Sequence, residues 1–353
     1  MTQFFNFMKK LLFLLIVFAY PTFAQFAGQG GVNFLKGNLR TPFDAAKSQN
    51  KMVFIEVFSP TCHVCQSFVP IFENPAVGST YNQQFVSYKL DINSPEAQAF
   101  FNAQKIWIPS LPMLLYFDKD VKLHHIGIMG EGMNQTSIVL KVANEALNPK
   151  VRASGAPARY KSGVRDPGFL IDYGLYSRIQ MDTVRSIQAM SDYAKTLSTA
   201  AMSSEVNFMV LQKIVLDTDN PLFKYLIGNM NVFYKKYPKQ QVNSVAENII
   251  MSSIFSSRGN AFNSQKISEL KGYLLKVGID TKSVENRTLM VELNALFRQN
   301  QAQQAIERIK KYISIAGPGP KEFEFLCNYV RSRSKDPKIL SQTTDWCKKG
   351  GVR

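Results

Sequence analysis

Two cysteines separated by two residues are the side chains of this 353-residue chain best placed to do chemistry. An apolar run typical of a strand, Met52 to Phe58, stops at Ser59-Pro60, and a helical pattern begins after Cys62. A thiol at a helix N-terminus lies near unpaired backbone N–H groups and the positive end of the helix dipole, which both stabilise a thiolate. We therefore predict that Cys62 is a nucleophile and that Cys65, one helical turn away, can form a disulfide with it.

Half of a zinc site has the same cysteine spacing, so a metal site is the alternative. It would need His63 and either His124 or His125 as further ligands, and the sequence contains no other histidine. Cys62 and His63 are adjacent and point in different directions at a helix start, and a distant strand would have to fold over the turn. The sequence therefore favours a redox pair, with no metal and no cofactor.

Glu56 is a carboxylate inside the apolar strand that precedes the cysteines. Its neighbours on both sides are apolar, as in a strand that is covered on both faces. Burial there would raise the pKa of the carboxyl group, so that Glu56 could exchange a proton with Cys65 near neutral pH. The alternative is an edge strand from which Glu56 points into solvent.

These features resemble the thioredoxin family over roughly residues 41 to 148. The resemblance rests on the Cys-x-x-Cys turn, on Glu56 and on Pro112, which directly precedes a second apolar strand. It implies an α/β fold with a central mixed sheet flanked by helices, and thiol–disulfide exchange with protein thiols and disulfides. It also implies that Glu56 assists proton transfer at Cys65 and that Pro112 is a cis-proline facing the disulfide.

The local sequence around the cysteines is similar to secreted thioredoxin-like proteins related to the C-terminal domain of the periplasmic disulfide-reductase transporters. It departs from thioredoxin in two places: Thr61 stands where tryptophan is usual, and His63-Val64 replaces Gly-Pro. A protonated His63 would stabilise the Cys62 thiolate and make the couple more oxidising than one with Gly-Pro. The alternative for His63 is a solvated turn residue without effect.

The first 24 residues have the pattern of a secretory signal peptide. Lys9-Lys10 precedes an apolar run from Leu11 to Tyr20, and a small residue, Ala24, ends the segment. A membrane anchor is the alternative, but the run is shorter than the roughly 20 residues that a spanning helix needs. We expect cleavage after Ala24, a periplasmic or otherwise exported protein, and no stable membrane span after cleavage.

Length and composition predict two domains, a thioredoxin-like domain at 25–150 and an α-helical domain at 169–353. Between them, 151–168 is rich in Gly, Pro, Ser, Ala and basic residues and is expected to be a linker. Helical hairpins are expected near 172–197 and 286–315 in an all-α array. The segment from 151 to the end contains no histidine, which removes the commonest general base.

The positive charge of the chain belongs to its second half. Residues 25–150 hold 10 Lys and Arg against 9 Asp and Glu, whereas residues 151–353 hold 30 against 17. These cations are scattered and the protein is expected to be exported, so we predict no nucleic-acid partner. Weak affinity for anionic envelope polymers or lipid is the alternative to a simple solvated surface.

Cys327 and Cys347 form a second cysteine pair near the C-terminus. Disulfides persist outside the cytoplasm, so this pair could be a structural disulfide between two consecutive helices, and two buried free thiols are the alternative.

Two functions follow from these patterns. The first is an exported thiol–disulfide oxidoreductase with Cys62, Cys65, Glu56 and Pro112 at its site and an unidentified partner that recharges the couple. The second is a helical interaction protein whose thioredoxin-like domain recognises partners with little turnover. The intact cysteine pair favours the first.

Overall fold

The computed structural model describes residues 30–352, so the predicted signal peptide, 1–24, lies outside the described residues. The described chain divides into two compact units. Unit 1 takes residues 30–100 and 110–155, and unit 2 takes residues 101–109 and 156–352. A short segment that lies between two parts of unit 1 in the sequence therefore belongs to unit 2.

A five-stranded mixed sheet forms the centre of unit 1, with the strand order β1-β3-β2-β4-β5. β1, β3 and β2 are parallel, and β4 pairs antiparallel with both β2 and β5. β2 is therefore the central strand and is buried along most of its length. The strands are β1 (Phe34–Leu35), β2 (Met52–Phe58), β3 (Phe85–Asp91), β4 (Met113–Phe117) and β5 (Leu123–Ile128).

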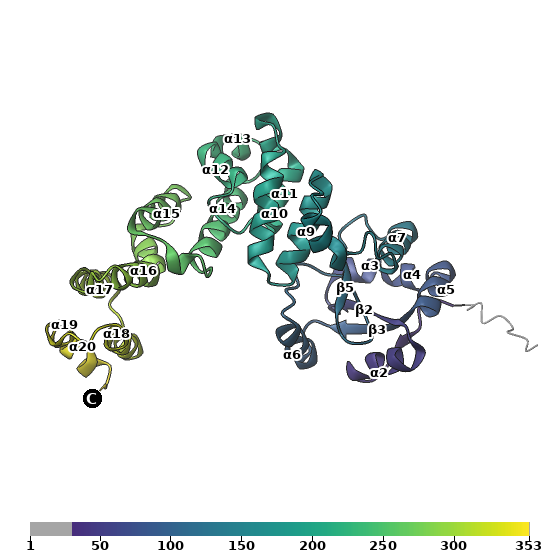
Figure 1. The fold of residues 1–353 in the computed structure, drawn as a ribbon, viewed down its shortest axis with the longest axis horizontal. Helices are drawn as coiled ribbons and strands as arrows, with labels where there is room; N and C mark the ends of the chain where they lie inside the picture. Colours follow the sequence, from purple (N-terminus) through teal and green to yellow (C-terminus); the bar gives the residue numbers. More distant parts are fainter. Residues whose placement is uncertain (1–29, 353) are drawn as a thin grey trace, which may run out of the picture. The chain divides into compact units, whose positions relative to one another are not determined.

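Helices cover both faces of this sheet (Figure 1). On one face, Phe54 packs against Tyr81 of α5 and Tyr116 of β4, and α7 closes the same core. On the other face, Phe117 contacts α2 and α6. The helices are α2 (Arg40–Gln49), α3 (His63–Ser67), α4 (Val69–Phe72), α5 (Pro75–Gln84), α6 (Pro95–Gln104) and α7 (Thr136–Leu147). The expected fold class, an α/β thioredoxin-like domain, is confirmed.

Two elements of unit 1 are not among those predicted from the sequence: α5 and the short edge strand β1. Asn74 begins α5 by accepting the Ala76 N–H at its side chain, and Pro75 occupies the first turn. An Asn-Pro pair is a recognised helix start, so this signal was present in the sequence. Two residues of β1 are too few to show an alternating pattern.

Unit 2 is all-α beyond residue 155 within the described chain, and both expected hairpins are present (Figure 1). α9 packs against α10, and α16 packs against α17. The longer helices are α9 (Pro167–Ile179), α10 (Thr183–Lys195), α11 (Glu205–Lys213), α12 (Pro221–Gly228), α14 (Lys239–Ile254), α15 (Ser264–Lys276), α16 (Thr281–Arg298), α17 (Ala302–Ala316) and α18 (Pro320–Arg333). Shorter ones include α13 (Met230–Tyr234), α19 (Pro337–Ser341) and α20 (Thr344–Lys349).

The interval 151–168, expected to be a linker, contains ordered elements instead. It includes a 3-10 turn, η1 (Ala153–Gly155), and a short helix, α8 (Ala156–Lys161). Ala156 and Tyr160, four residues apart, turn to the same side and are buried, and the Tyr160 hydroxyl donates to Asp192 Oδ2 at 2.5 Å. Two apolar residues are too few for a periodic signal, so composition alone suggested a linker.

Across residues 30–352, no helix is both long enough and apolar enough to cross a bilayer.

Candidate functional site

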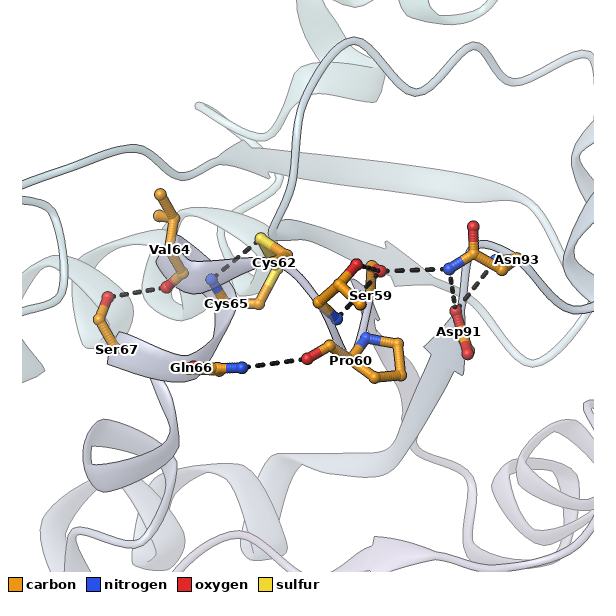
Figure 2. Close-up of a disulfide and its surroundings, with 10 residues drawn as sticks. Ser59, Pro60, Cys62, Val64, Cys65, Gln66, Ser67, Asp91 and Asn93 are labelled. Carbon is orange, nitrogen blue, oxygen red and sulfur yellow. Dashed lines mark hydrogen bonds between the residues drawn. A yellow bond between two sulfur atoms is a disulfide. The ribbon is translucent and has the colours of Figure 1, made fainter.

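The two cysteines lie where the central strand passes into a helix, and they form a disulfide (Figure 2). β2 ends at Phe58, and Cys62 is the N-cap residue of α3 with extended backbone angles. The backbone N–H of Cys65 donates to Cys62 Sγ at 3.1 Å. Cys65 is only 3% exposed whereas Cys62 is partly exposed. One cysteine of the pair is therefore accessible to solvent and the other is buried.

A set of polar side chains holds the turn that carries Cys62 (Figure 2). The Asn93 amide donates to Ser59 Oγ at 3.1 Å, and Ser59 Oγ lies 3.1 Å from Thr61 Oγ1. On the helix side, the Gln66 amide donates to the Pro60 carbonyl at 3.0 Å. The backbone N–H of Cys62 itself donates to the Ser59 carbonyl at 3.0 Å. These contacts fix the position of Cys62 relative to the end of β2.

Sequence reasoning missed Ser59 and Asn93 as supporting residues. Asn93 follows β3, and its backbone N–H donates to Asp91 Oδ1 at 3.0 Å in a tight turn. An Asp two residues before an Asn is a local turn signal, but it does not reveal that the turn lies beside Ser59. That neighbourhood comes from the parallel pairing of β2 with β3.

The helix that carries the cysteines is broken next to Pro70. α3 ends at Ser67, α4 begins at Val69, and Phe68 is the cap residue for both. Pro70 stands in the first turn of α4, where the N–H that it lacks has no helical acceptor. The Phe68 side chain is fully buried, so the break is anchored in the core.

Glu56 lies in the centre of the sheet and is 1% exposed, so the edge-strand alternative is wrong. Its neighbours across the ladders are Lys89 on β3 and Leu114 on β4. Burial raises the pKa of the Glu56 carboxyl, and this effect outweighs the opposing attraction of Lys89, whose Nζ lies 3.2 Å from Oε2. A carboxyl with a raised pKa can hold and release a proton closer to neutral pH than an exposed glutamate.

Lys89 is a partner of the site that the sequence did not reveal. Its ammonium lies 4.8 Å from the centroid of the Phe34 ring and 5.8 Å from that of Phe58. The aliphatic stem of a lysine can cross such apolar surface while its charge stays near water. The sequence does show a lysine within an otherwise mostly buried strand. It does not show that this lysine pairs with Glu56 across the sheet.

The raised pKa of Glu56 predicts a specific dependence of stability on pH. Below the ordinary pKa of 4.5, Glu56 is protonated in both the folded and the unfolded state. Between 4.5 and the raised pKa of the folded state, Glu56 ionises in the unfolded state but stays protonated in the folded state, which stabilises the unfolded state. The free energy of unfolding of the wild type should therefore fall relative to Glu56→Gln as pH rises above about 4.5. Lys89→Met should extend this loss to higher pH, because the ion pair that lowers the pKa is removed.

Urea denaturation of the three proteins between pH 4 and pH 8 measures this effect. A difference between wild type and Glu56→Gln that stays constant with pH would show that the Glu56 pKa is not raised.

Pro112 follows a cis peptide bond with Leu111 and is buried at the start of β4. Met113 pairs with Val57, one residue before the end of β2. Because β2 and β4 are antiparallel, the start of β4 and the end of β2 meet at the same edge of the sheet. The structure thus brings Pro112 and the Cys62 turn to one edge.

His63 lies on a different element from His124 and His125. His63 is exposed in α3. In β5, His124 Nε2 lies 3.0 Å from Asp118 Oδ2, while His125 is buried and its Nδ1 accepts the Ala153 N–H at 3.1 Å. Among the residues that the structure describes, no cluster of three or more His, Cys, Asp or Glu could hold a metal ion. The alternative zinc site is therefore not assembled in this part of the chain.

Cys327 and Cys347 form a second disulfide, which joins α18 to α20. Both residues are buried, with Cα atoms 5.1 Å apart. Neither residue of this second pair is exposed, whereas Cys62 of the first pair is partly exposed.

No protein-family model matches this chain, and no curated protein matches it. Solved structures similar to it include a thioredoxin from Thermus thermophilus, with 15% identity over 38% of this chain and 99% of that chain and a TM-score of 0.29. They also include the disulphide isomerase from Xylella fastidiosa Temecula1, with 14% identity over 33% of this chain and 98% of that chain and a TM-score of 0.27. These matches therefore leave about two thirds of this chain uncovered.

Proposed function

We propose that this chain is an exported thiol–disulfide oxidoreductase that acts on protein disulfides through the Cys62–Cys65 couple. The observation that carries the proposal is the disulfide at the N-cap of α3, with Cys62 partly exposed and Cys65 buried behind it. A helix start favours the thiolate form of Cys62. The buried Cys65 thiol lies close enough to Cys62 to attack a mixed disulfide formed there.

The exchange proceeds in two steps. In the reduced protein, the Cys62 thiolate attacks one sulfur of a client disulfide; the client S–S bond breaks, a mixed disulfide forms, and one client thiolate leaves and takes up a proton. Cys65 then loses its proton, and its sulfur attacks Cys62 Sγ. The mixed disulfide breaks, the second client sulfur leaves as a thiolate and takes up a proton, and the client has gained the two electrons that the couple has lost.

Glu56 is the proposed acceptor of the Cys65 proton. Its raised pKa suits this role, since a carboxyl group that ionises nearer to neutral pH can both take up and return a proton. Pro112, at the same edge of the sheet as the Cys62 turn, is proposed to hold the client backbone across from the disulfide. Lys89 limits how far burial raises the Glu56 pKa.

Export is part of the same proposal. The N-terminal sequence has the pattern of a signal peptide, and a buried Cys327–Cys347 disulfide suits an oxidising compartment. The couple then needs a second partner, a protein dithiol or disulfide that returns Cys62 and Cys65 to the starting state. Sequencing the N-terminus of the mature protein tests export, and we expect it to begin at Gln25.

Reduction of insulin with a thiol as electron source, and reactivation of scrambled ribonuclease, test the proposed activity. We expect the wild type to accelerate at least one of them. Acceleration of neither, by folded protein with a reducible Cys62–Cys65 bond, would contradict the enzyme proposal and favour a recognition module with little turnover.

Replacing His63 should change the redox potential of the couple. A protonated imidazole beside Cys62 stabilises the thiolate and with it the reduced form, so His63→Gly should raise the Cys62 pKa and shift the potential in the reducing direction. Equilibration with glutathione buffers measures the potential. Because His63 is exposed, the substitution leaves the core intact. An unchanged potential would assign the whole effect to the helix start.

A further inference from the structure

A cavity of about 530 Å³ lies within unit 2 and is lined by cations, without a carboxylate among the described residues. One wall is the segment that contains Trp107 and Pro109, and the others come from α9, α11 and α14. The charged lining residues are Arg178 and Lys213, and no acidic side chain of the described chain lines it. Such a cavity has a positive potential without a built-in counter-charge.

Arg178 is the more buried of the two cations that line this cavity. Its guanidinium lies 4.3 Å from the centroid of the Trp107 ring, and Nη1 donates to the Lys213 carbonyl. Burial lowers the pKa of Arg178 to about 10, and within residues 30–352 no carboxylate lies within ion-pair distance of it. Arg308 provides a contrast, because that well-buried arginine is paired with both Glu285 and Glu292.

A desolvated cation without a counter-charge is costly, and an anionic ligand would relieve that cost. The planar guanidinium stacked on an indole presents its edge for paired hydrogen bonds with a carboxylate. Lys213, which is exposed and has no ion pair among the described residues, adds a second positive charge at the mouth. These groups select a carboxylate.

The rim next to these cations is apolar. Phe255 ends α14 with its side chain 72% exposed, and Met251 lies one turn before it. A large exposed aromatic side chain at the edge of a cavity is typical of a contact surface for a polypeptide. An occupant that fits the whole surface therefore combines an acidic side chain with an apolar one.

The cavity wall is also close to the proposed client site along the chain. The backbone N–H of Trp107 donates to the Ile179 carbonyl at 2.8 Å, which fixes this wall on α9. Pro109 precedes Pro112 by three residues, so their Cα atoms are at most about 11 Å apart whatever path the chain takes.

We propose that this cavity is a specificity pocket for the client polypeptide, in which Arg178 and Lys213 bind an Asp or Glu side chain a few residues from the exchanging cysteine. A neighbouring apolar side chain of the client packs on Phe255 and Met251. This inference rests on the proposed thiol–disulfide exchange for its biological use, but binding to the pocket can be measured without exchange.

Two synthetic peptides test the proposal. Each contains one internal disulfide and a Phe, and they differ only in a Glu or a Gln four residues from the cysteine. The rate constant for oxidation of the reduced wild type should be about tenfold larger with the Glu peptide, as for one charge-assisted contact. Arg178→Met, which keeps a long apolar side chain on Trp107, should bring the ratio of the two rate constants close to one.

Arg185→Met is the matched control, because Arg185 is an exposed arginine in the same unit, paired with Asp182. It should keep the tenfold ratio. A wild-type ratio near one, with both peptides reacting, would overturn the specificity pocket while leaving the proposed function intact.

Binding is measured separately with Cys62→Ser/Cys65→Ser protein and cysteine-free versions of the two peptides. Trp107 lines the pocket and Trp346 is the only other tryptophan, so the intrinsic fluorescence should respond to the Glu peptide and much less to the Gln peptide. If the wild type exchanges with no peptide yet the Glu peptide binds, the pocket stands and the proposed function fails. Equal binding of both peptides would overturn the pocket.

Discussion

Cys62→Ser should reduce thiol–disulfide exchange to the uncatalysed background, whereas Cys65→Ser should accumulate a mixed disulfide with the client. The difference follows from position: Cys62 caps α3 and is partly exposed, while Cys65 is buried one turn inside the helix. Without Cys62 no sulfur can attack the client, and without Cys65 the first step occurs but the second has no nucleophile.

Gel analysis under non-reducing conditions measures the trapped complex, and insulin reduction measures turnover. Alkylation of each single-cysteine variant at mildly acidic pH provides the control, since Cys62 in Cys65→Ser should react rapidly and Cys65 in Cys62→Ser slowly. Equal alkylation rates, or a trapped complex with Cys62→Ser instead, would reverse the assignment of nucleophile and resolving cysteine.

Removing the second disulfide should destabilise the C-terminal helices strongly. Cys327 and Cys347 are separated by 20 residues, and the chain-entropy relation gives about 3 kcal/mol for closing a loop of that length. Cys327→Ala/Cys347→Ala should therefore lower the free energy of unfolding of this region by about that amount. Exchange chemistry at Cys62 should be unaffected, because these residues lie in unit 2.

Trp346 reports on this region, because it is buried beside Cys347 in α20. Urea denaturation followed by tryptophan fluorescence should show an earlier transition in the double variant than in the wild type. Cys62→Ala/Cys65→Ala is the matched control: it removes a disulfide with a sequence separation of three and should shift this transition little. An unchanged transition in Cys327→Ala/Cys347→Ala would mean that the disulfide contributes nothing to unit 2.

Local sequence determined much of unit 1. The strand before Cys62, the helix start at the cysteines and the break at Pro70 are all short-range signals: apolar runs, a turn pair and a proline. Burial of Glu56 was also predictable, because a continuous apolar run around a carboxylate requires a strand covered on both faces. Such signals depend only on residues close together in sequence, so they can be recognised without knowing the fold.

Only the tertiary structure decided which distant residues complete the site. Lys89 faces Glu56 and Asn93 supports Ser59 because β2 and β3 are parallel in one particular register. An alternating pattern would specify the register, but both strands are buried on both faces and show no such alternation.

The sequence likewise left the state of Cys327 and Cys347 open, and the packing of α18 against α20 decided it. The segment 101–109 was expected within the thioredoxin-like domain, yet it belongs to the helical unit, where Trp107 meets Arg178. A domain boundary depends on where a segment buries the most apolar surface. A segment can bury that surface against residues distant in sequence as readily as against its sequence neighbours. Sequence by itself thus predicted a disulfide-forming cysteine pair at a helix start, and the tertiary structure determined what surrounds it.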